Sequence, residues 1–413
     1  MDTIIYKLGG TSQCLLGYKN LIEIISNNNN NNIIVLSAIK GVTNNLINFI
    51  KTKDLNYINE VEKINNLLYE SITNKSYDIY LNSIYYLKQL CINFINGSNV
   101  ENEIIGYGEI LSSIIFSVFL TENNIDHELL YAYNNVFSNL FNEFYIKPFK
   151  FIVNKNIYVV QGFIASTESN EKILLGRGGS DTTGSLFAQY MKAKYYEVWT
   201  DVDGIYTCDP NIYNFAKIIP EIDYVLCQEL SAMGAKVMHP LSIRPCEIAN
   251  IPIYIRNTFT KNIGTTICKP FISKIKHDFL CFAIQKNATV FKIKSLNMWN
   301  SYGFITEIFK EFSNRNVDVN IITTSQFSVS TTTFEHNYDK LLQIKNALST
   351  KFNTIMINNC HILSYISNNI QDKLNKIKIN QFKPEIIHFS DNNLSISIVL
   401  KDITNIYNLL SYI

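Results

Sequence analysis

Two glycine-rich segments of similar design constrain the fold of this chain more than any other feature. The first is IIYKLGGTS (Ile4–Ser12), and the second begins with LLGRGGSD at Leu174. Each passes from a short apolar run through glycines into a stretch with helical character. Glycines just before a helix leave backbone N–H groups unpaired, and the helix dipole adds partial positive charge there. Both segments are therefore candidate anion sites at strand-to-helix turns.

Each of these loops also carries a cation. Lys7 precedes the first glycine pair, and Arg177 lies within the second loop, where Ser180 and Asp181 are expected to cap the following helix. Neither loop fits the common phosphate-binding fingerprints, and one such loop alone would favour a tight structural turn. Two loops of this kind can face a polyphosphate and an acidic substrate from opposite sides.

Composition excludes several classes of partner. The chain has 36 Lys and Arg against 35 Asp and Glu, a net charge of +1, so no global field attracts nucleic acid or an acidic membrane. Its eight cysteines form no C-x-x-C pair, which argues against a disulfide framework or a zinc site. We expect no signal peptide and no apolar run of membrane-spanning length. These features predict a cytoplasmic protein without nucleic-acid or membrane partners.

The order of periodic segments predicts two kinds of architecture. Strands and helices alternate over residues 1 to about 265, which predicts a parallel-sheet α/β sandwich, with a helical hairpin between Tyr57 and Ile95. After a linker the order becomes βαββα, the ferredoxin-like split, and it recurs more weakly after residue 355. The expected elements are strand Ala288–Ile293, helix Gly303–Phe312, strands Val317–Thr323 and Phe327–Thr333, helix Tyr338–Leu348, strands Asn359–Ser364, Glu385–Phe389 and Leu394–Leu400, and helix Ile403–Leu410.

Seven segments, in order, resemble the aspartokinases of the amino-acid kinase superfamily: KLGGTS, VLSAIKGVTN, GYGEILSS, GFIAST, LGRGGSD, TDVDGIYTCDP and GAKVMHP. A later block, SLNMWNSYGFITEIF followed by VDVNIITTS, resembles the first ACT regulatory module of the monofunctional, lysine-sensitive class. The resemblance implies a three-layer αβα sandwich with a mainly parallel sheet, followed by two ferredoxin-like (βαββαβ) ACT units. The expected boundaries are 1–263 for the catalytic domain, 264–285 for the linker, 286–354 for ACT unit 1 and 355–413 for an abbreviated ACT unit 2.

The activity implied by this resemblance is phosphorylation of the L-aspartate side chain by ATP. The product is 4-phospho-L-aspartate, and the reaction is the first step of lysine, threonine and methionine biosynthesis. The aspartate carboxylate is already ionised near neutral pH, so the site must align two anions and neutralise charge rather than remove a proton. Lysines, backbone N–H groups and Mg²⁺ bound through the ATP phosphates suit this task, with no direct metal ligand from the protein. His239 is interpreted as structural.

The resemblance also assigns roles to individual residues. The expected catalytic residues are Lys7, Asp181 and Lys236, and Thr43, Glu109 and Arg177 are expected to bind aspartate, with Glu109 meeting its α-ammonium and Arg177 its α-carboxylate. The expected ATP-binding residues are Lys7, Gly9, Gly10, Ser12, Gly178, Gly179, Ser180, Thr200, Asp201, Tyr206, Asn211 and Lys236. Asn211 stands where the family usually has Arg, which predicts weaker nucleotide binding, and Leu8 replaces the usual Phe.

The candidate effector site departs further from the family pattern. It comprises Met298, Ser301, Gly303, Phe304, Ile305, Val319, Asn320, Thr324, Ser325 and Gln326. Asn320 and Gln326 replace two acidic side chains of the lysine-sensitive class, so charge-assisted pairing to a lysine ammonium is lost. We therefore expect weak or absent lysine inhibition, with the ACT units kept for assembly of a homodimer.

Other interpretations share some of these features. Sibling kinases that act on acetylglutamate, glutamate or uridylate have the same fold, but GYGE, LGRGGSD and the ACT pair argue against them. A bifunctional aspartokinase–homoserine dehydrogenase needs a further domain, for which 413 residues leave no room. A catalytically weak amino-acid sensor is disfavoured because five key residues are present together, namely Lys7, Glu109, Arg177, Asp181 and Lys236.

Overall fold

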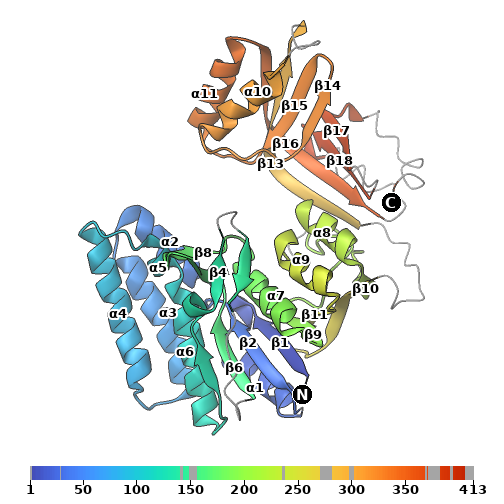
Figure 1. The fold of residues 1–413 in the computed structure, drawn as a ribbon. Coiled ribbons are helices and arrows are strands. Elements are labelled where there is room, and N and C mark those ends of the chain that lie inside the picture. The colour runs from blue at the N-terminus through green and yellow to red at the C-terminus, as the bar shows by residue number, and fades with distance from the viewer. Residues whose placement is uncertain are drawn as a thin grey trace. The chain divides into compact units, whose positions relative to one another are not determined.

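The computed structural model describes residues 2–27, 29–139, 143–147, 156–234, 238–269, 281–296, 302–367, 370, 382–390 and 394–404. These residues form two compact units (Figure 1). Unit 1 takes in the described parts of Met1–Tyr206, Lys217–Gln228 and Lys236–Ile275, and unit 2 those of Thr207–Ala216, Glu229–Ala235 and Lys276–Ile413. The chain therefore contributes to unit 2 twice before residue 263, where the catalytic domain was expected to end.

Unit 1 is built on an eight-stranded sheet in the order β10-β12-β11-β9-β1-β2-β6-β3. The strands from β11 to β3 run parallel, whereas β12 pairs antiparallel with β11 and parallel with β10. The central strands are almost wholly apolar and buried, as expected when both faces of a parallel sheet are covered. Their bounds are β1 (Thr3–Leu8), β2 (Asn31–Leu36), β3 (Glu128–Leu130), β6 (Ile157–Gln161), β9 (Tyr195–Thr200), β10 (Glu221–Ile222), β11 (Ile253–Asn257) and β12 (Ile263–Ile267).

Helices cover both faces of this sheet, which gives the expected αβα sandwich. On one face Tyr6 and Leu8 of β1 join a large apolar core with α1 (Leu15–Ile25) and α6 (Tyr107–Glu122). On the other face α7 (Gly179–Met191) contacts β1, β2 and β9, and α9 (Pro240–Ala249) packs on α7. Because strand residues alternate in direction, Lys7 points to the α7 face. Unit 1 also contains α2 (Val42–Thr52), α5 (Glu101–Ile105) and the first part of α8 (Tyr224–Ala232), whose last residues are assigned to unit 2.

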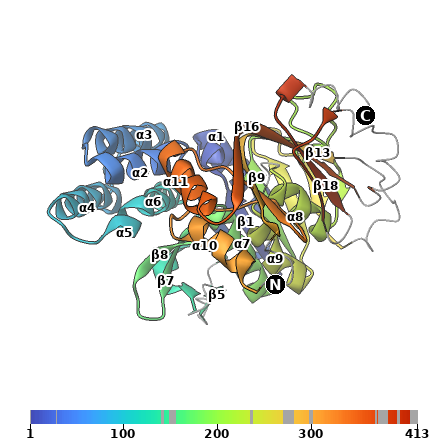
Figure 2. The same ribbon diagram turned by 90° about the horizontal axis from the view of Figure 1, so that it is seen from above.

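The predicted helical hairpin is present as α3 (Asn56–Ile72) and α4 (Asp78–Ile95), which lie outside α6 (Figure 2). The Tyr69 and Tyr80 rings stack between them with centroids 4.1 Å apart. The stretch Glu101–Glu122 is long and apolar enough to cross a membrane, judged by length and composition alone. Of the apolar 18-residue window within it, 78% is buried inside the protein, which is the pattern of a core helix.

A small four-stranded sheet borders the main one, in the order β5-β4-β7-β8. Its strands are β4 (Val136–Ser138), β5 (Phe144–Ile146), β7 (Ile164–Thr167) and β8 (Lys172–Leu174). The structure divides the apolar stretch from Ile157 to Thr167 into β6 and β7. Phe163, with φ 68°, breaks the strand, and Gly162 has no room for a side chain because a Cβ there would lie 2.5 Å from Cβ of Ser180.

Unit 2 contains a six-stranded antiparallel sheet in the order β14-β15-β13-β16-β18-β17. Helices α10 (Phe304–Ser313) and α11 (Tyr338–Ser349) pack through Ile308, Phe312 and Ile344 on a core that includes Phe291 and Ile293. The expected strand Val317–Thr323 is shorter and later, at β14 (Ile322–Ser325). The other strands are β13 (Cys281–Lys294), β15 (Ser328–Thr333), β16 (Asn353–Ile366), β17 (Ile386–Phe389) and β18 (Ser395–Leu400).

Two long strands join the halves of this sheet. β13 and β16 each have 14 residues, and they pair from Cys281↔Ile366 to Lys294↔Asn353. One end of this pair adjoins β15 and the other adjoins β18. The expected boundaries at 285/286 and 354/355 both fall inside these strands. The expected helix Ile403–Leu410 is largely outside the described residues, which end at residue 404.

Candidate active site

A cavity of about 270 Å³ lies at the carboxyl ends of β1 and β2 in unit 1. Open α/β sheets bind their ligands at this edge. The cavity brings together most of the predicted core of the site: Lys7, Thr43, Glu109, Gly178, Gly179, Ser180 and Asp181. Its remaining lining residues are Ser37, Ala38, Phe163 and Gly176, which belong to the quoted motifs but were given no individual role.

Lys7 and Asp181 form an ion pair in the lining of this cavity. The Lys7 Nζ atom lies 2.6 Å from Asp181 Oδ1, and the two side chains are only 10% and 14% exposed. Lys7 comes from β1, and Asp181 from the first turn of α7. A buried lysine that is held by a carboxylate presents its charge in a fixed direction, which suits recognition of a phosphoryl group.

The first glycine-rich loop is tied to β9 by hydrogen bonds. The Gly9 N–H donates to the Trp199 carbonyl at 3.0 Å, and the Ser12 hydroxyl donates to the same carbonyl at 3.1 Å. The Ser12 hydroxyl also lies 2.6 Å from Thr258 Oγ1. Gly10 packs so closely that a Cβ there would lie 2.8 Å from the Ala38 carbonyl oxygen. Ser12 therefore anchors the loop to β9 and to Thr258 through hydrogen bonds. Gly10, which has no side chain, allows the loop to pack closely against the segment that contains Ala38.

The second glycine-rich loop depends on the left-handed backbone of Gly176 (φ 75°) and Gly178 (φ 66°). The N-cap of α7 is Gly178, so the expectation that Ser180 or Asp181 caps the helix was wrong. Both lie inside its first turn instead, where Asp181 interacts favourably with the helix dipole. A glycine at this position is required by its backbone conformation and by its close contact with His239.

Replacing Gly178 with alanine is expected to disrupt this loop. A Cβ there would lie 2.4 Å from Cβ of His239, on a backbone with positive φ, so we expect a loss of about 1–3 kcal/mol in the free energy of unfolding and a large loss of nucleotide binding. Urea denaturation measures the first and calorimetric titration with ATP the second. Gly97→Ala is the matched control, because Gly97 also has positive φ (99°) but a Cβ there would meet no atom within 4 Å. Equal losses in both variants would contradict the steric argument.

Glu109 is a fully buried carboxylic acid on α6 that faces the same cavity. Its Oε2 atom has no hydrogen-bond partner, while the backbone of Ala38 bonds to the carboxyl group. Burial raises the pKa of Glu109 to about 8, and the hydrogen bonds and the Lys7 charge only partly oppose this rise. A buried, incompletely paired acid next to open space is typical of a site that receives a cationic group.

The structure does not bring all predicted residues to the cavity. Arg177 is exposed in its loop, and its side chain is not among the cavity-lining residues. Thr200 and Asp201 follow β9, where the Thr200 hydroxyl lies 3.4 Å from Asp201 Oδ1, and Tyr206 pairs with Ile218 in an isolated bridge. Asn211 belongs to unit 2, where it bonds Asp209, and Lys236 lies outside the described residues.

A buried ion pair between β9 and β11 was not anticipated from the sequence. Arg256 donates to both carboxylate oxygens of Glu197, from Nε at 2.9 Å and Nη2 at 2.8 Å. Trp199 Nε1 also donates to Glu197, and the Arg256 guanidinium lies 5.7 Å from the Trp199 ring centroid. A glutamate inside an otherwise apolar strand was the available signal, because a buried charge needs a partner. The ion pair links β9 to β11, and the end of β9 is where the Trp199 carbonyl binds the first glycine-rich loop.

His239 has the structural role that was predicted for it. It is the N-cap of α9, where its Nδ1 accepts a hydrogen bond from the Leu241 N–H at 3.4 Å. Pro240 follows as the first helical residue, a position that tolerates proline.

The candidate effector residues lie in unit 2. Gly303 (φ 81°) is the N-cap of α10, with Phe304 and Ile305 in its first turn. Asn320 precedes β14, where its N–H donates to the Thr332 carbonyl, while its side chain and that of Gln326 are exposed. Val319 packs on the α10 core, and Thr324 and Ser325 belong to β14. Met298 and Ser301 lie outside the described residues.

Comparisons with known proteins agree with this fold. Among curated relatives, lysine-sensitive aspartokinase 3 of Escherichia coli is 29% identical over 355 residues, which cover 80% of this chain and 78% of that protein. The aspartokinase of Rickettsia prowazekii is 33% identical over 279 residues, which cover 65% of this chain and 54% of the relative.

A solved structure extends the likeness to the whole fold. E. coli aspartokinase III in complex with aspartate and ADP matches with a TM-score of 0.84 at 23% identity, covering 100% of both chains. The amino acid kinase family model matches residues 2–257, which is more than half of the chain. The chain therefore belongs to the amino acid kinase family.

Proposed function

We propose that this protein is an aspartate kinase, which transfers the γ-phosphoryl group of ATP to the side-chain carboxylate of L-aspartate. The observation that carries the proposal is the meeting of the Lys7–Asp181 ion pair and the buried Glu109 in one cavity of an amino acid kinase fold. A cation at one side suits a phosphate, and an acid at the other suits an α-ammonium group. The aspartokinase names of the relatives support the same substrate.

The residues of the cavity divide the work as follows. Lys7 neutralises charge that spreads over the γ-phosphoryl oxygens, and the free N–H groups at the start of α7 bind the phosphates. Glu109 accepts hydrogen bonds from the substrate ammonium, beside Thr43, and Arg177 reaches from its exposed loop to the α-carboxylate. The nucleophile is already a carboxylate, so no general base is needed. Gly9, Gly10, Thr200, Asp201, Tyr206 and Lys236 complete the proposed nucleotide side.

Mg²⁺ fits this site as a partner of the nucleotide. Among the described residues, no group of three or more His, Cys, Asp or Glu side chains is placed to hold a metal ion. The cation is therefore expected to bind through phosphate oxygens and water, with Asp181 as the cavity carboxylate able to orient those waters. When bound, it would supply charge neutralisation between the two reacting anions.

An ADP-release assay with ATP, Mg²⁺ and L-aspartate tests the assignment. We expect turnover that requires aspartate and is absent with L-glutamate or N-acetylglutamate. Release of ADP with either of those acids and not with aspartate would reject the substrate and leave a sibling kinase. We also propose a cytoplasmic location. We further propose a homodimer formed through the ACT units, and size-exclusion chromatography with light scattering would check its mass.

Lysine is expected to inhibit this enzyme weakly or not at all. Asn320 and Gln326 offer only neutral oxygens to a lysine ammonium, so charge-assisted hydrogen bonds are lost. Restoring both acids in the variant Asn320→Asp/Gln326→Glu should raise lysine affinity about tenfold or more, since about 1.4 kcal/mol corresponds to a factor of ten. Isothermal titration of both proteins with L-lysine measures this. Micromolar lysine binding by the unaltered protein would contradict the expectation.

A further inference from the structure

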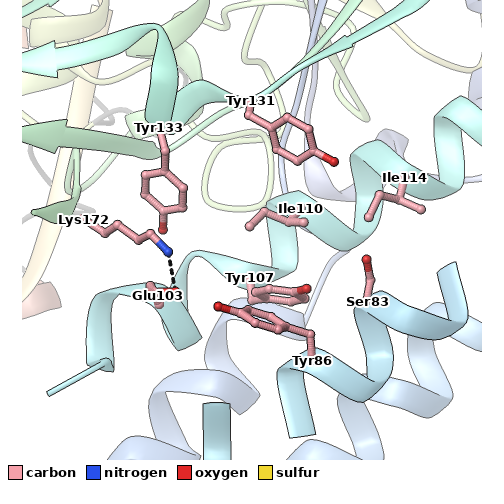
Figure 3. Close-up of a pocket in the computed structure, with 9 residues that line it drawn as sticks. All are labelled: Ser83, Tyr86, Glu103, Tyr107, Ile110, Ile114, Tyr131, Tyr133 and Lys172. Atoms are coloured by element: carbon pink, nitrogen blue, oxygen red, sulfur yellow. Dashed lines mark ion pairs between the residues drawn. The ribbon is translucent and has the colours of Figure 1, made fainter. Parts of the chain in front are cut away.

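A second cavity, of about 220 Å³, lies against helix α6 in unit 1 (Figure 3). Tyr107, Ile110 and Ile114 line it at positions i, i+3 and i+7, which form one stripe of that helix. The other lining residues are Ser83 and Tyr86 of α4, Glu103 of α5, Tyr131, Tyr133 and Lys172. None of these nine residues lines the catalytic cavity.

One end of this cavity carries two opposite charges. Lys172 Nζ lies 2.5 Å from Glu103 Oε2, and neither side chain is fully buried. The Lys172 ammonium also lies 5.2 Å from the centroid of the Tyr133 ring. The carboxylate and ammonium of a free α-amino acid are a complementary pair, because the first can bind Lys172 and the second Glu103. Such a ligand would replace the Lys172–Glu103 ion pair with two, one from its carboxylate to Lys172 and one from its ammonium to Glu103.

The other end is formed by aromatic rings and aliphatic side chains. The Tyr86 and Tyr107 rings stack with centroids 5.8 Å apart at 30°. In Figure 3 Tyr131 lies across the cavity from this stack, with Ile110 and Ile114 between them on the helix side. Flat rings around a small space favour an occupant that is itself flat and apolar, because offset stacking adds to the burial of apolar surface.

A buried hydroxyl points to a polar group on the occupant. The Tyr133 hydroxyl is buried and has no hydrogen-bond partner, although buried polar groups are nearly always paired. Figure 3 shows it directed towards the Glu103–Lys172 pair, where it can donate to a carboxylate that also binds Lys172. At about 30 Å³ for each water, the space holds roughly seven waters. That size suits one amino acid.

We propose that this cavity binds a free aromatic α-amino acid. Its carboxylate binds Lys172 and the Tyr133 hydroxyl, its ammonium binds Glu103, and its ring packs against Tyr86, Tyr107 and Tyr131. This site does not depend on the kinase activity proposed above, because its residues are separate from the catalytic cavity and its occupancy is measured directly.

Isothermal titration of the full chain with L-phenylalanine tests the proposal. We expect saturable 1:1 binding, together with weaker binding of phenethylamine, which lacks the carboxylate, by about tenfold or more. Lys172→Met should weaken L-phenylalanine binding to a similar extent, and Tyr133→Phe also by about tenfold or more, because the lost hydrogen bond goes to a charged carboxylate. Lys88→Met and Tyr85→Phe are the matched controls, since Lys88 pairs with Glu62 outside the cavity and Tyr85 is exposed on α4.

Three results would overturn the proposal. The first is the absence of saturable L-phenylalanine binding at millimolar concentration. The second is equal binding of phenethylamine, which would reject recognition of the carboxylate. The third is an equal loss of binding in Lys172→Met and Lys88→Met, with circular dichroism used to establish that both variants are folded. An inactive kinase that still binds L-phenylalanine would reject the proposed function and keep this site.

Discussion

Replacing Glu109 with glutamine is expected to raise the KM for aspartate about 10- to 150-fold, the effect of losing a charged hydrogen bond worth about 1.5–3 kcal/mol. The glutamine keeps the size and one oxygen of the side chain but cannot carry charge. In the unaltered protein, burial raises the pKa of Glu109 to about 8, so much of the acid is protonated near neutral pH. We therefore expect the KM for aspartate to fall between pH 6.5 and 8.5, and to stay flat over this range in Glu109→Gln.

The same substitution is expected to stabilise the protein at alkaline pH. Glu109 ionises near its ordinary pKa of 4.5 in the unfolded chain but near 8 in the fold, so the folded state binds more protons in between. Stability conferred by the protonated acid is therefore complete below pH 4.5 and is lost as pH rises through 8, by roughly 1.4 kcal/mol for each pH unit. Glutamine has no such dependence, so its advantage should grow over this window.

Urea denaturation at pH 5, 7 and 9, alongside steady-state kinetics, checks both effects. Glu122→Gln is the matched control, because Glu122 ends the same helix but is hydrogen-bonded to Tyr77 and Lys75, which hold its pKa below the ordinary value. An aspartate KM that is unchanged in Glu109→Gln would reject the role of Glu109 in binding the ammonium. A stability difference that does not vary with pH would reject the raised pKa.

Replacing Lys7 with methionine is expected to lower kcat about 10²- to 10³-fold. Loss of a single fixed electrostatic donor at a transition state costs about 2.7–4 kcal/mol. Methionine keeps most of the side-chain volume, so β1 should remain packed, but the nearly buried Asp181 loses its ion-pair partner. Removing one partner of a buried pair is destabilising, and the double variant Lys7→Met/Asp181→Asn should recover stability without recovering kcat.

Measurements of kcat, KM for ATP and thermal unfolding separate these effects. Lys7→Arg serves as a second comparison, since it keeps the charge but changes its geometry. If the double variant regained both stability and kcat, Lys7 would be a structural residue that only neutralises Asp181. A kcat for Lys7→Met within threefold of that of the unaltered enzyme would reject the catalytic role of Lys7.

The centre of the site could be anticipated from sequence because local chain direction determines it. Lys7 closes a buried strand and Asp181 opens a helix after glycines, so parallel-sheet topology brings both to one edge. Glu109 is in the first turn of an apolar helix, where its position and burial follow from the same layering. The resemblance to the aspartokinases also predicted that Asp181 orients Lys7, and the structure agrees with an ion pair of 2.6 Å between them.

Other features depend on partners that are distant along the chain. The segment Ile263–Ile267, with its glycine and threonines, was assigned mostly to a linker, but it forms β12. Thr265 is buried there because its hydroxyl donates to the Ile219 carbonyl at 2.7 Å and accepts from the Ile205 N–H at 2.8 Å. No local pattern reveals either partner. Gly162 likewise has no room for a side chain only because Ser180 lies against it.

The long strands β13 and β16 run through both halves of unit 2, so neither half has a complete sheet without the other. A cut at residue 354 would remove most of the central strand on which β13, β15 and β18 depend, directly or through one neighbour. We infer that this sheet melts as a single cooperative element rather than as two modules. A chimaera that exchanges regulatory regions between kinases of this kind should therefore take the stretch from residue 281 onwards as one block, together with the two earlier segments of unit 2.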